Sequence, residues 1–489
     1  MEQSISNEQS TEEKIEQKIE QRTLDVLVLA AGLGTRMRSD QAKVLHELDG
    51  RALINHVCRT ATALAPRKIY VVIGHQGEDV KTAVLEELDN EHVEFVWQKE
   101  QLGTGDAVNA ARQFLETEDS TLLILSGDVP MIRAETLAAL VQQHHNHRGK
   151  GAACTLLTVK LEDPTGYGRI VRDEGGVFQK IVEQKDANPD EKTIKEINAG
   201  IYCFDTKKLF AALSSVKNNN AQGEYYLTDV PGLLRDSVEN VSLYQHTDAR
   251  EVSGINNRVE LADLERTLCR RTVSRMMLDY GVTFIDPKNV YISERANIGR
   301  DTIIYPNVSV EGETEIGDGC TIRSGTRITN SRIGRGVKIL DNCVITDSEI
   351  SDNCAVGPFA HLRGKAKMEE SAKVGNFVEL KKTVLGRGSK ASHLTYLGDA
   401  TIGERTNIGA GTITCNYDGK NKHSTIIEDN VKIGSDTMLV APVRVGSGSV
   451  TGAGSVVTKD VPPDSLVAGV PAQVKKNLRE KDNTEAKSV

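Results

Sequence analysis

Long apolar runs, paired cysteines and a surplus of basic residues are all missing from this chain of 489 residues. No stretch approaches the roughly 18 consecutive apolar residues of a membrane span, so we expect no membrane segment. The 8 cysteines form no Cys-x-x-Cys pair and no metal-type group with histidine, which favours reduced thiols in a cytoplasmic protein. With 60 basic against 69 acidic residues, the chain lacks a general basic field for nucleic acid. Local clusters of basic residues could still bind small anionic ligands.

The two ends of the chain are polar. Residues 1–22 contain no apolar core of the kind found in secretory signals, so we expect no export. Ile15 and Ile19 are four residues apart and Thr11 could cap them, so a short, marginal helix is an alternative to a mobile extension. We expect no catalytic role for this segment, and we expect the charged tail 477–489 to fray.

The chain is long enough for two to four domains, and its first part alternates short β-branched runs with helical stretches. DVLVLAAG, KIYVVIG, VEFVWQ and TLLILSGD are predicted strands, while ALINHVCRTATALA and VKTAVLEEL are predicted helices. Apolar strands separated by helices indicate a mostly parallel sheet that is covered on both faces. We assign this α/β domain to residues 23–255.

Three polar, glycine-containing stretches follow these strands: LAAGLGTRM (29–37), QKEQLGTG (98–105) and SGDVP (126–130). Ligands bind at the carboxyl ends of parallel strands, so the three stretches can line one crevice. Gly32-x-Gly34 is followed by Met37 where a dinucleotide-binding turn requires glycine or alanine, which weakens a dinucleotide interpretation. A glycine turn over which Arg36 and Lys43 reach a phosphate fits better.

A connecting helix is predicted over residues 256–282, from the spacing of Val259, Leu264, Leu268 and Met276. After it, an aliphatic residue returns every six positions, with occasional five-residue steps. The members of this series are Ile298, Ile304, Val310, Ile316, Ile322, Ile328, Ile333, Ile339, Ile345, Ile350, Val356, Leu362, Met368, Val374, Ile402, Ile408, Ile427, Ile433, Leu439 and Val445.

This hexapeptide period indicates a parallel β-helix over residues 283–476, with the aliphatic residue pointing to the axis. Small residues four positions later share the narrow interior: Thr302, Val308, Thr314, Cys320 and Thr326. A β-sandwich is the alternative, but it requires alternation over longer strands. The polar interruption TCNYDGKNKHST (414–425) should project as a loop.

Further motifs in the first domain are AKVLHEL, DPTGYGRI, VEQKDA, EINAGIY, NNAQGEYYLTD and GINN. Together with the three strand-end stretches they resemble the sugar-1-phosphate nucleotidyltransferases. Joined to a hexapeptide domain, the order of motifs from about Thr23 to Pro471 resembles the bacterial family of bifunctional N-acetylglucosamine-1-phosphate uridyltransferases and glucosamine-1-phosphate N-acetyltransferases. The resemblance implies a Rossmann-like nucleotidyltransferase domain, a left-handed β-helix and a homotrimer.

In the first domain the resemblance implies uridylyl transfer from UTP to N-acetylglucosamine 1-phosphate, giving UDP-N-acetylglucosamine for the cell envelope. Several negative charges then meet, so the protein needs cations and fixed geometry more than a base. The implied Mg²⁺ ligands are Asp128 and Asn256, since hard oxygen donors suit this ion. The implied UTP and sugar residues are Leu29, Ala30, Ala31, Gly32, Gly34, Arg36, Lys43, Gln98, Gly103, Thr104, Gly168, Glu183, Asn198 and Asn256.

In the second domain the resemblance implies acetyl transfer from acetyl-CoA to glucosamine 1-phosphate, at sites between subunits. His393, in ASHLTYLGD, corresponds to the general base, because an amine must lose a proton to become a nucleophile. The implied acceptor-site residues are Arg363, Lys381, Tyr396 and Asn407. The implied acetyl-CoA residues are Ala410, Asn416, Tyr417, Ser435 and Ala453.

The chain departs from the family pattern at a few positions. Asp106 stands where many relatives carry histidine, and HLRGK stands where the family commonly reads RLRPG, so that His361 and Gly364 replace arginine and proline. Lys475 or Lys476 could meet the phosphates of CoA in place of an arginine. Two further hypotheses stay open: a nucleotidyltransferase whose β-helix is only a trimerising scaffold, and a non-enzymatic subunit that inherited the architecture.

Overall fold

The computed structural model describes residues 23–478 apart from residue 33 and residues 148–150. The expected N-terminal extension 1–22 and most of the expected tail 477–489 therefore lie outside the described residues. The chain divides into two compact units, and the boundary falls between Leu264 and Glu265, inside helix α9. Within the described part, none of the helices is long and apolar enough to cross a membrane.

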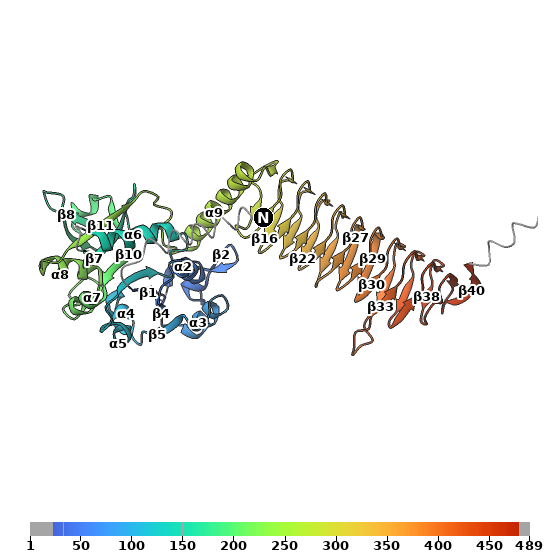
Figure 1. The fold of residues 1–489 in the computed structure, drawn as a ribbon, viewed down its shortest axis with the longest axis horizontal. Coiled ribbons are helices and arrows are strands. Elements are labelled where there is room, and N and C mark those ends of the chain that lie inside the picture. The colour runs from blue at the N-terminus through green and yellow to red at the C-terminus, as the bar shows by residue number, and fades with distance from the viewer. Residues whose placement is uncertain (1–22, 33, 148–150, 479–489) are drawn as a thin grey trace, which may run out of the picture. The chain divides into compact units, whose positions relative to one another are not determined.

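The first unit is built on a twisted sheet with strand order β11-β7-β10-β6-β1-β4-β5, to which β8 and β9 are added (Figure 1). Strands β6, β1, β4 and β5 run parallel, as predicted, whereas β10 runs antiparallel to β6 and β7. The strands are β1 (Leu24–Leu29), β4 (Lys68–Ile73), β5 (Val93–Trp97), β6 (Thr121–Ser126), β7 (Cys154–Lys160), β8 (Arg169–Arg172), β9 (Phe178–Val182), β10 (Glu196–Asp205) and β11 (Val241–His246), with a small hairpin of β2 (Glu47–Leu48) and β3 (Arg51–Ala52).

Helices cover both faces of this sheet, which explains why its central strands are apolar throughout. In β1, Val26 and Val28 pack into the core on one face and Leu27 into the core on the other. The helices are α2 (Leu53–Thr62), α3 (Gly77–Leu85), α4 (Thr104–Ala110), α5 (Arg112–Leu115), α6 (Ala134–Asn146), α7 (Thr206–Leu213) and α8 (Val230–Asp236). The predicted strands and helices between residues 25 and 128 are therefore confirmed.

Helix α9 (Arg258–Asp279) is the predicted connecting helix, shorter at both ends than expected. The side chain of Asn257 accepts hydrogen bonds from the backbone N–H groups of Val259 and Glu260, at 2.9 and 3.0 Å, and so caps its first turn. Leu264, Leu268 and Met276 are buried, but Val259 is 70% exposed. The prediction that Val259 belongs to the apolar face was wrong. Residues four apart, such as Leu264 and Leu268, share a helix face, whereas Val259 lies five residues before Leu264 and points to a different face.

The second unit contains a parallel β-helix, as the six-residue period predicts. Residues 18 positions apart pair in register, for example Ile298 with Ile316 and Ile304 with Ile322, so three six-residue steps make one coil. The β-sandwich alternative is wrong, since the strands are short and pair in parallel between successive coils.

One face of the β-helix forms a separate sheet, made by β14 (Asn297–Ile298), β17 (Glu315–Ile316), β20 (Arg332–Ile333), β23 (Glu349–Ile350), β26 (Lys367–Met368), β28 (Val384–Leu385), β30 (Ala400–Ile402), β33 (Thr425–Ile427) and β36 (Val443–Val445). The other two faces are made by β12 (Thr283–Phe284), β13 (Tyr291–Ile292), β15 (Ile303–Ile304), β16 (Ser309–Glu311), β18 (Thr321–Ile322), β19 (Arg327–Thr329), β21 (Lys338–Ile339), β22 (Val344–Thr346), β24 (Ala355–Val356), β25 (His361–Arg363), β27 (Lys373–Lys381), β29 (Lys390–Gly398), β31 (Asn407–Ile408), β32 (Ile413–Cys415), β34 (Lys432–Ile433), β35 (Met438–Val440), β37 (Val450–Thr451), β38 (Val456–Val457), β39 (Ser465–Ala468) and β40 (Gln473–Asn477).

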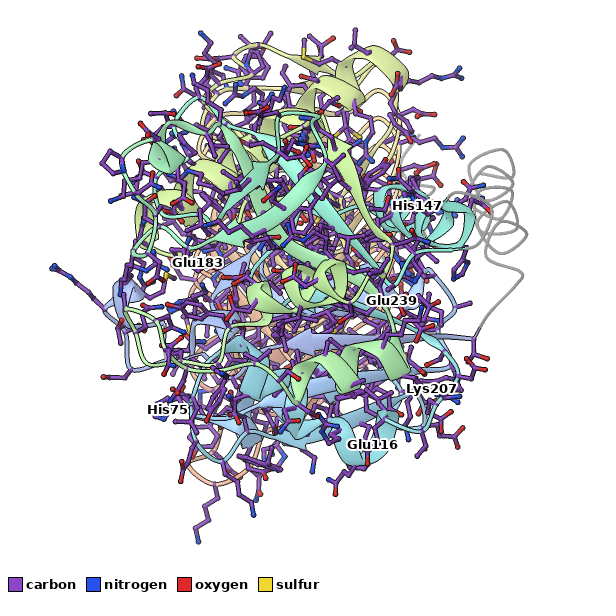
Figure 2. The ribbon with its side chains drawn as sticks, turned by 90° about the vertical axis from the view of Figure 1, so that its left-hand side faces the viewer. His75, Glu116, His147, Glu183, Lys207 and Glu239 are labelled. Carbon is purple, nitrogen blue, oxygen red and sulfur yellow. The ribbon has the colours of Figure 1, made fainter. Side chains whose placement is uncertain are left out.

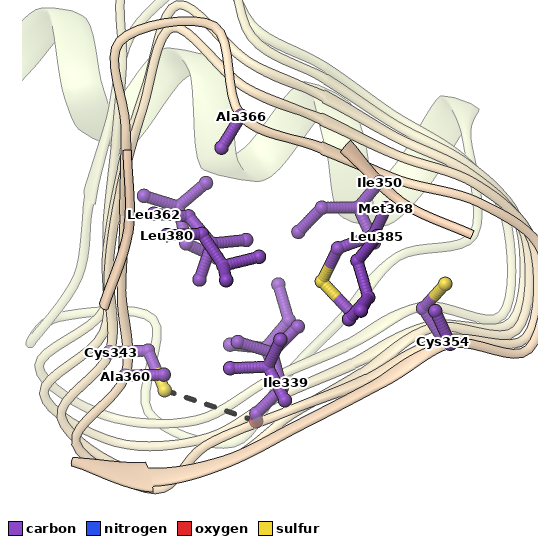
Figure 3. Close-up of a cluster of buried hydrophobic side chains, with 14 of the residues drawn as sticks. Ile339, Cys343, Ile350, Cys354, Ala360, Leu362, Ala366, Met368, Leu380 and Leu385 are labelled. Atoms are coloured by element: carbon purple, nitrogen blue, oxygen red, sulfur yellow. Dashed lines mark hydrogen bonds between the residues drawn. The ribbon is translucent and has the colours of Figure 1, made fainter. Parts of the chain in front are cut away.

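The aliphatic series fills the axis of the β-helix. Figure 3 shows Ile339, Leu362 and Met368, which come from three different faces, converging on one interior. Every member of the series is buried, and so are the small residues predicted to accompany it. The thiol of Cys343, for example, donates a hydrogen bond to the backbone oxygen of Val356 at 3.9 Å within this interior. The repeat therefore supplies a continuous core that no single coil could form alone.

The polar interruption projects from the β-helix, as predicted, near β33 (Figure 1). Ile402 pairs with Ile427, 25 positions later, whereas Leu385 pairs with Ile402, 17 positions later, so the loop lengthens this coil. Within the loop, Tyr417 bridges Lys422, and the carboxylate of Asp418 lies 2.7 Å from His423 Nε2. Backbone N–H groups of the loop and His423 together lower the pKa of Asp418. The loop is thus held by its own polar contacts.

Candidate active sites

The three polar stretches of the first unit meet at one edge of the sheet. Leu29 ends β1, Gln98 follows β5 and Asp128 follows β6, and these strands are parallel. Backbone hydrogen bonds from Gly127 N–H to Leu29 O and from Gln98 N–H to Ile73 O, both 2.9 Å, tie the stretches to neighbouring strands. The crevice expected from parallel strand order is therefore present.

Two adjoining cavities occupy this edge, with volumes of about 460 and 320 Å³. Both are lined by Leu29, Thr104, Ser126 and Asp128, which places these residues at their junction. The first cavity, which we call the nucleotide cavity, is also lined by the expected residues Ala30, Ala31, Gly32, Gly34, Lys43, Gln98 and Gly103. The second, which we call the sugar cavity, is also lined by the expected residues Arg36, Gly168, Glu183, Asn198 and Asn256.

Lys43 connects the two residues expected to bind a metal. Its ammonium forms an ion pair with the carboxylate of Asp128 and donates a hydrogen bond to Asn256 Oδ1 at 3.2 Å. Arg36 Nη2 donates to the same Asn256 oxygen at 2.7 Å. The side chains of Lys43 and Asp128 are only 17% and 14% exposed, so little water screens this pair. Two oxygens thus converge on one cation at the edge of both cavities.

The glycine turn brings Lys43 to this position. Gly34 has a φ of 60°, in the left-handed region that glycine adopts without strain. A Cβ atom added to Gly34 would lie 2.5 Å from Lys43 Cβ, so any larger residue would displace the lysine. The short helices η1 (Thr35–Met37) and η2 (Lys43–Leu45) then present Arg36 and Lys43 beside the crevice.

Gln98 occupies the far side of the nucleotide cavity. It is 7% exposed, and its Nε2 donates hydrogen bonds to Asp106 Oδ2 at 2.8 Å and to Gly103 O at 3.2 Å. Gln101 Nε2 donates to Ala31 O at 2.6 Å and so joins this loop to the glycine turn. This side of the cavity therefore combines backbone groups with the fixed amides of Gln98 and Gln101.

The sugar cavity holds polar side chains aimed at one small space. Glu183, labelled in Figure 2, directly follows β9, and its Oε1 accepts a hydrogen bond from Thr228 Oγ1 at 3.1 Å. Burial raises the pKa of this carboxyl, and nearby acidic residues add to the effect. Asn198 Nδ2 donates to the hydroxyl of Tyr202 at 2.6 Å. Hydroxyl and amide groups of a sugar could exchange hydrogen bonds with this set.

Sequence reasoning missed several residues of these cavities, among them Gln101, Tyr167, Thr228 and Glu260. Glu260 accepts a hydrogen bond from Asn256 N–H at 2.6 Å and so positions a residue that sequence reasoning did find. The sequence could have indicated three of them only through their place inside motifs quoted above: Gln101, Tyr167 and Thr228. Glu260 belongs to the first turn of α9 and gave no signal.

On the β-helix, His393 lies opposite Asn376 on the preceding coil. His393 Nδ1 is 2.6 Å from Asn376 Oδ1, so with this amide orientation Nδ1 carries the proton. In the tautomer with this proton, Nε2 keeps the lone pair of a proton acceptor, and His393 is exposed. Asn376 was missed by sequence reasoning, although it lies only five residues before the expected residue Lys381.

Basic and polar groups follow His393 on the next face. Arg363 and Lys381 are directly paired on neighbouring coils, and Lys381 pairs with Gly398 on the next. Arg363 Nε donates to Glu379 Oε1 at 2.7 Å, a partner that sequence reasoning missed. The absence of a side chain at Gly398 leaves room for the ring of Tyr396 and for Asn416, whose Nδ2 donates to Asp399 Oδ2 at 2.5 Å. The expected residues Arg363, Lys381, Tyr396 and Asn416 therefore lie on successive neighbouring coils.

The residues expected to meet acetyl-CoA form a column. Strand β29 pairs with β32, β32 with β35, and β35 with β38, and their registers place Ala410, Ser435 and Ala453 on successive coils in line with His393. Tyr417 is 60% exposed at the base of the loop, whereas Asn416 beside it is buried. Asn407 does not join these residues: it pairs with Lys390 and Lys432 on the face before the corner.

Comparison with known proteins accounts for both units. A family model described as nucleotidyl transferase matches residues 25–249. In the second unit, a model of the GMPPB C-terminal domain matches residues 287–368, and one of the bacterial transferase hexapeptide (six repeats) matches residues 424–459. The hexapeptide match accords with the left-handed winding expected of the β-helix.

Curated relatives extend over nearly the whole chain. "Bifunctional protein GlmU" of Heliobacterium modesticaldum is 52% identical over 440 residues, which are 90% of this chain and 94% of the relative. The proteins of the same name from Syntrophomonas wolfei and Shouchella clausii are 48% and 47% identical, over 91% and 92% of this chain and 96% and 97% of their own lengths. At this identity and coverage, the chain belongs to the family of bifunctional GlmU proteins.

Proposed function

We propose that this chain is a bifunctional enzyme that acetylates glucosamine 1-phosphate with acetyl-CoA and then transfers a uridylyl group from UTP to the product. The second reaction gives UDP-N-acetylglucosamine and pyrophosphate. The observation that carries the proposal is the convergence of Lys43, Asp128 and Asn256 at the junction of a nucleotide cavity and a sugar cavity. A transferase that joins two phosphate-bearing substrates needs its cationic centre at this place.

In uridylyl transfer, a phosphate oxygen of the sugar 1-phosphate attacks the α-phosphorus of UTP, and pyrophosphate leaves. Lys43 and Arg36 offset the charge that accumulates around the phosphates. Leu29 to Gly32 and Gln98 hold the base, while Glu183, Asn198 and Gly168 hold the sugar. Because binding fixes both substrates, the reaction needs no protein nucleophile.

The residues present fit a magnesium ion. Asp128 and Asn256 offer oxygen donors, and both already contact the ammonium of Lys43, so a cation suits the position. The described residues contain no group of three or more His, Cys, Asp or Glu that could hold a metal, so the substrate phosphates would complete the shell. When bound, Mg²⁺ supplies charge neutralisation on the triphosphate.

In acetyl transfer, the amine nitrogen of the sugar attacks the thioester carbonyl, and His393 Nε2 takes the proton that this amine loses. The new C–N bond replaces the C–S bond, and the CoA thiolate leaves. Asn376 holds the imidazole so that Nε2 faces outward. Arg363 and Lys381 offer positive charge to the sugar phosphate, and the column above His393 offers backbone to the cofactor.

We further propose that the chain forms a homotrimer in the cytoplasm, where UTP and acetyl-CoA are available. His393 is exposed in the single chain, and the flat faces of a β-helix provide a deep pocket only where another surface covers them. Beside His393, the corner residues Phe359, Phe377 and Leu394 are 48%, 56% and 63% exposed. A second copy of the chain would remove this apolar column from water.

The first test measures pyrophosphate release from UTP and N-acetylglucosamine 1-phosphate with Mg²⁺. We expect Asp128→Asn to lower the rate by about 10²–10³-fold, because the shape is kept while the charge that holds the cationic centre is lost. Asp119→Ala is the matched control, since Asp119 is 77% exposed and pairs only loosely with Lys207 at 3.8 Å. Wild-type protein that releases no pyrophosphate above a buffer blank would exclude this reaction.

The second test measures thiol release from acetyl-CoA with glucosamine 1-phosphate on the same preparation. We expect His393→Ala to lower this rate by about 10²–10⁴-fold, the usual contribution of a general base, and to leave uridylyl transfer intact. His75→Ala removes an exposed histidine of the other unit and should leave acetyl transfer unchanged. Loss of both activities in a folded His393 variant would contradict separate sites. Absence of acetyl transfer in wild type would leave the single-activity hypothesis.

A further inference from the structure

Asp106 lies behind Gln98 at the nucleotide cavity and has no role in the mechanism proposed above. It lies in the first turn of α4, half-buried, and its Oδ2 accepts a hydrogen bond from Gln98 Nε2 at 2.8 Å. Gln98 itself is buried and lines the nucleotide cavity. Asp106 therefore contacts the one amide side chain expected to read the base.

The partners of Gln98 decide which way its amide points. A carboxylate and a backbone carbonyl offer only acceptor oxygens, so the nitrogen of the amide must face Asp106 and Gly103. Both amide hydrogens are then engaged. Among the residues that the structure describes, none donates a hydrogen bond to Gln98 Oε1. This oxygen is the part of Gln98 that is left for a ligand in the cavity.

An acceptor at this point selects among bases. On its pairing edge uracil has a single donor, N3–H, while the corresponding N3 of cytosine is an acceptor. If UTP binds here, as proposed above, Gln98 Oε1 must meet N3–H, because the flanking oxygens of uracil cannot donate. Cytosine placed in the same way would bring two acceptors together and leave both without a partner.

We propose that Asp106 is a positioning residue that sets the preference for a uracil base by fixing the amide of Gln98. Without Asp106, the amide can turn over at the cost of its bond to Gly103, and Nε2 can then donate to cytosine N3. This inference rests on the proposed uridylyl transfer, and it concerns the selection of the base rather than the chemistry at phosphorus.

The test compares UTP with CTP as substrates of the full chain, with Mg²⁺ and N-acetylglucosamine 1-phosphate. For Asp106→Ala we expect the ratio of kcat/KM for UTP to that for CTP to fall by about tenfold, with the change mainly in KM, since one well-placed hydrogen bond to a base contributes about that much discrimination. The ratio cancels the lost charge of Asp106, because that charge acts equally on both triphosphates.

Asn109→Ala is the matched control. Asn109 is exposed on the same helix and accepts a hydrogen bond from Arg112 Nε, so its removal changes α4 without touching Gln98. We expect its UTP to CTP ratio to equal that of the wild type. Should Asp106→Ala not fold, Asp106→Asn replaces it, with an expected fall of about threefold because a neutral acceptor holds the amide less strongly.

The outcomes separate this proposal from the one on which it rests. Wild-type protein that does not release pyrophosphate from UTP contradicts the proposed function itself. Wild-type protein that prefers UTP, with a folded Asp106 variant whose ratio stays within about twofold of it, overturns the role of Asp106 alone. An equal fall in kcat/KM for UTP and for CTP would also overturn the role of Asp106 in base selection, because it would indicate an electrostatic or structural role.

Discussion

At the residue scale, the polar side chains of both sites act through partners from other parts of the chain. Lys43 reaches Asn256 across 213 positions, and His393 is held by Asn376 on the coil before it. Hydrogen bonds likewise orient two side chains that line the cavities: Asp106 orients Gln98, and Thr228 orients Glu183. Because each partner is fixed in turn by packing, single substitutions should change selectivity and pH response before they change the fold.

Glu183 provides a prediction on pH. Burial raises the pKa of Glu183 above the ordinary value of 4.5. At pH values between 4.5 and the raised pKa, this carboxyl is therefore protonated in the folded protein and ionised in the unfolded chain. Folding stability from this group therefore falls as the pH rises through that window. The affinity for the sugar substrate should instead increase as the pH rises, because only the ionised carboxylate of Glu183 is a full acceptor for a sugar hydroxyl. We expect the KM for N-acetylglucosamine 1-phosphate to rise as the pH falls through the window.

Glu183→Gln mimics the protonated form, so it should raise this KM by about tenfold at neutral pH and remove its dependence on pH. The KM for UTP should change little, and it serves as the internal reference. Glu162→Gln is a control, since the Glu162 side chain is 98% exposed and forms a surface ion pair with Lys195. A sugar KM in Glu183→Gln that still follows the wild-type pH profile would show that another group titrates.

At the scale of elements, one corner of the β-helix differs from the rest. Phe359, Phe377 and Leu394 have φ of 54°, 55° and 45°, while Asn342 and Gly411 hold the same corner on the flanking coils. Asparagine and glycine tolerate this conformation, whereas a bulky residue in it is strained by about 1–3 kcal/mol. The rings of Phe359 and Phe377 stack with centroids 5.3 Å apart. The subunit contact proposed above would bury these three exposed apolar residues beside His393.

Phe377→Asn tests this explanation without damaging the single chain, since asparagine suits the left-handed corner. If the wild-type protein is the proposed trimer, we expect light scattering to show a mass about threefold lower for this variant, because the subunit contact is lost. Acetyl transfer should be lost with it, and uridylyl transfer should continue. Asn342→Gly, in the same corner but without an apolar side chain, should leave the mass unchanged. A wild-type protein of single-chain mass would refute the trimer.

At the scale of the whole molecule, the chain combines two units with separate cores and separate candidate sites. The nucleotide and sugar cavities are lined by residues of the first unit, and the His393 column belongs to the second. Nothing in either set of contacts requires a residue of the other unit. This separation is why the Asp128 and His393 substitutions are expected to remove one activity each.

Most of the architecture could be predicted because two periodicities dominate the sequence. Apolar runs that end in glycine and polar residues fixed the parallel strands and their common edge, and the six-residue period fixed which side chains point to the axis. The prediction was wrong at Val259, where an apolar residue lies in the first turn of α9 but off its buried face. It left out Asn376, Glu379 and Glu260, whose roles come only from their contacts.

The sequence by itself determined the order of the motifs, the two kinds of repeat and the types of residue available for chemistry, because these are local properties of the chain. Only the tertiary structure decided which residues face one another. Each face of a coil takes five or six residues, and this spacing sets which side chains meet between coils, such as Arg363 with Glu379 and His393 with Asn376. Inserting or deleting a residue in one coil would shift every later contact. In the first unit, the amide of Gln98 points as it does because the fold places a carboxylate behind it.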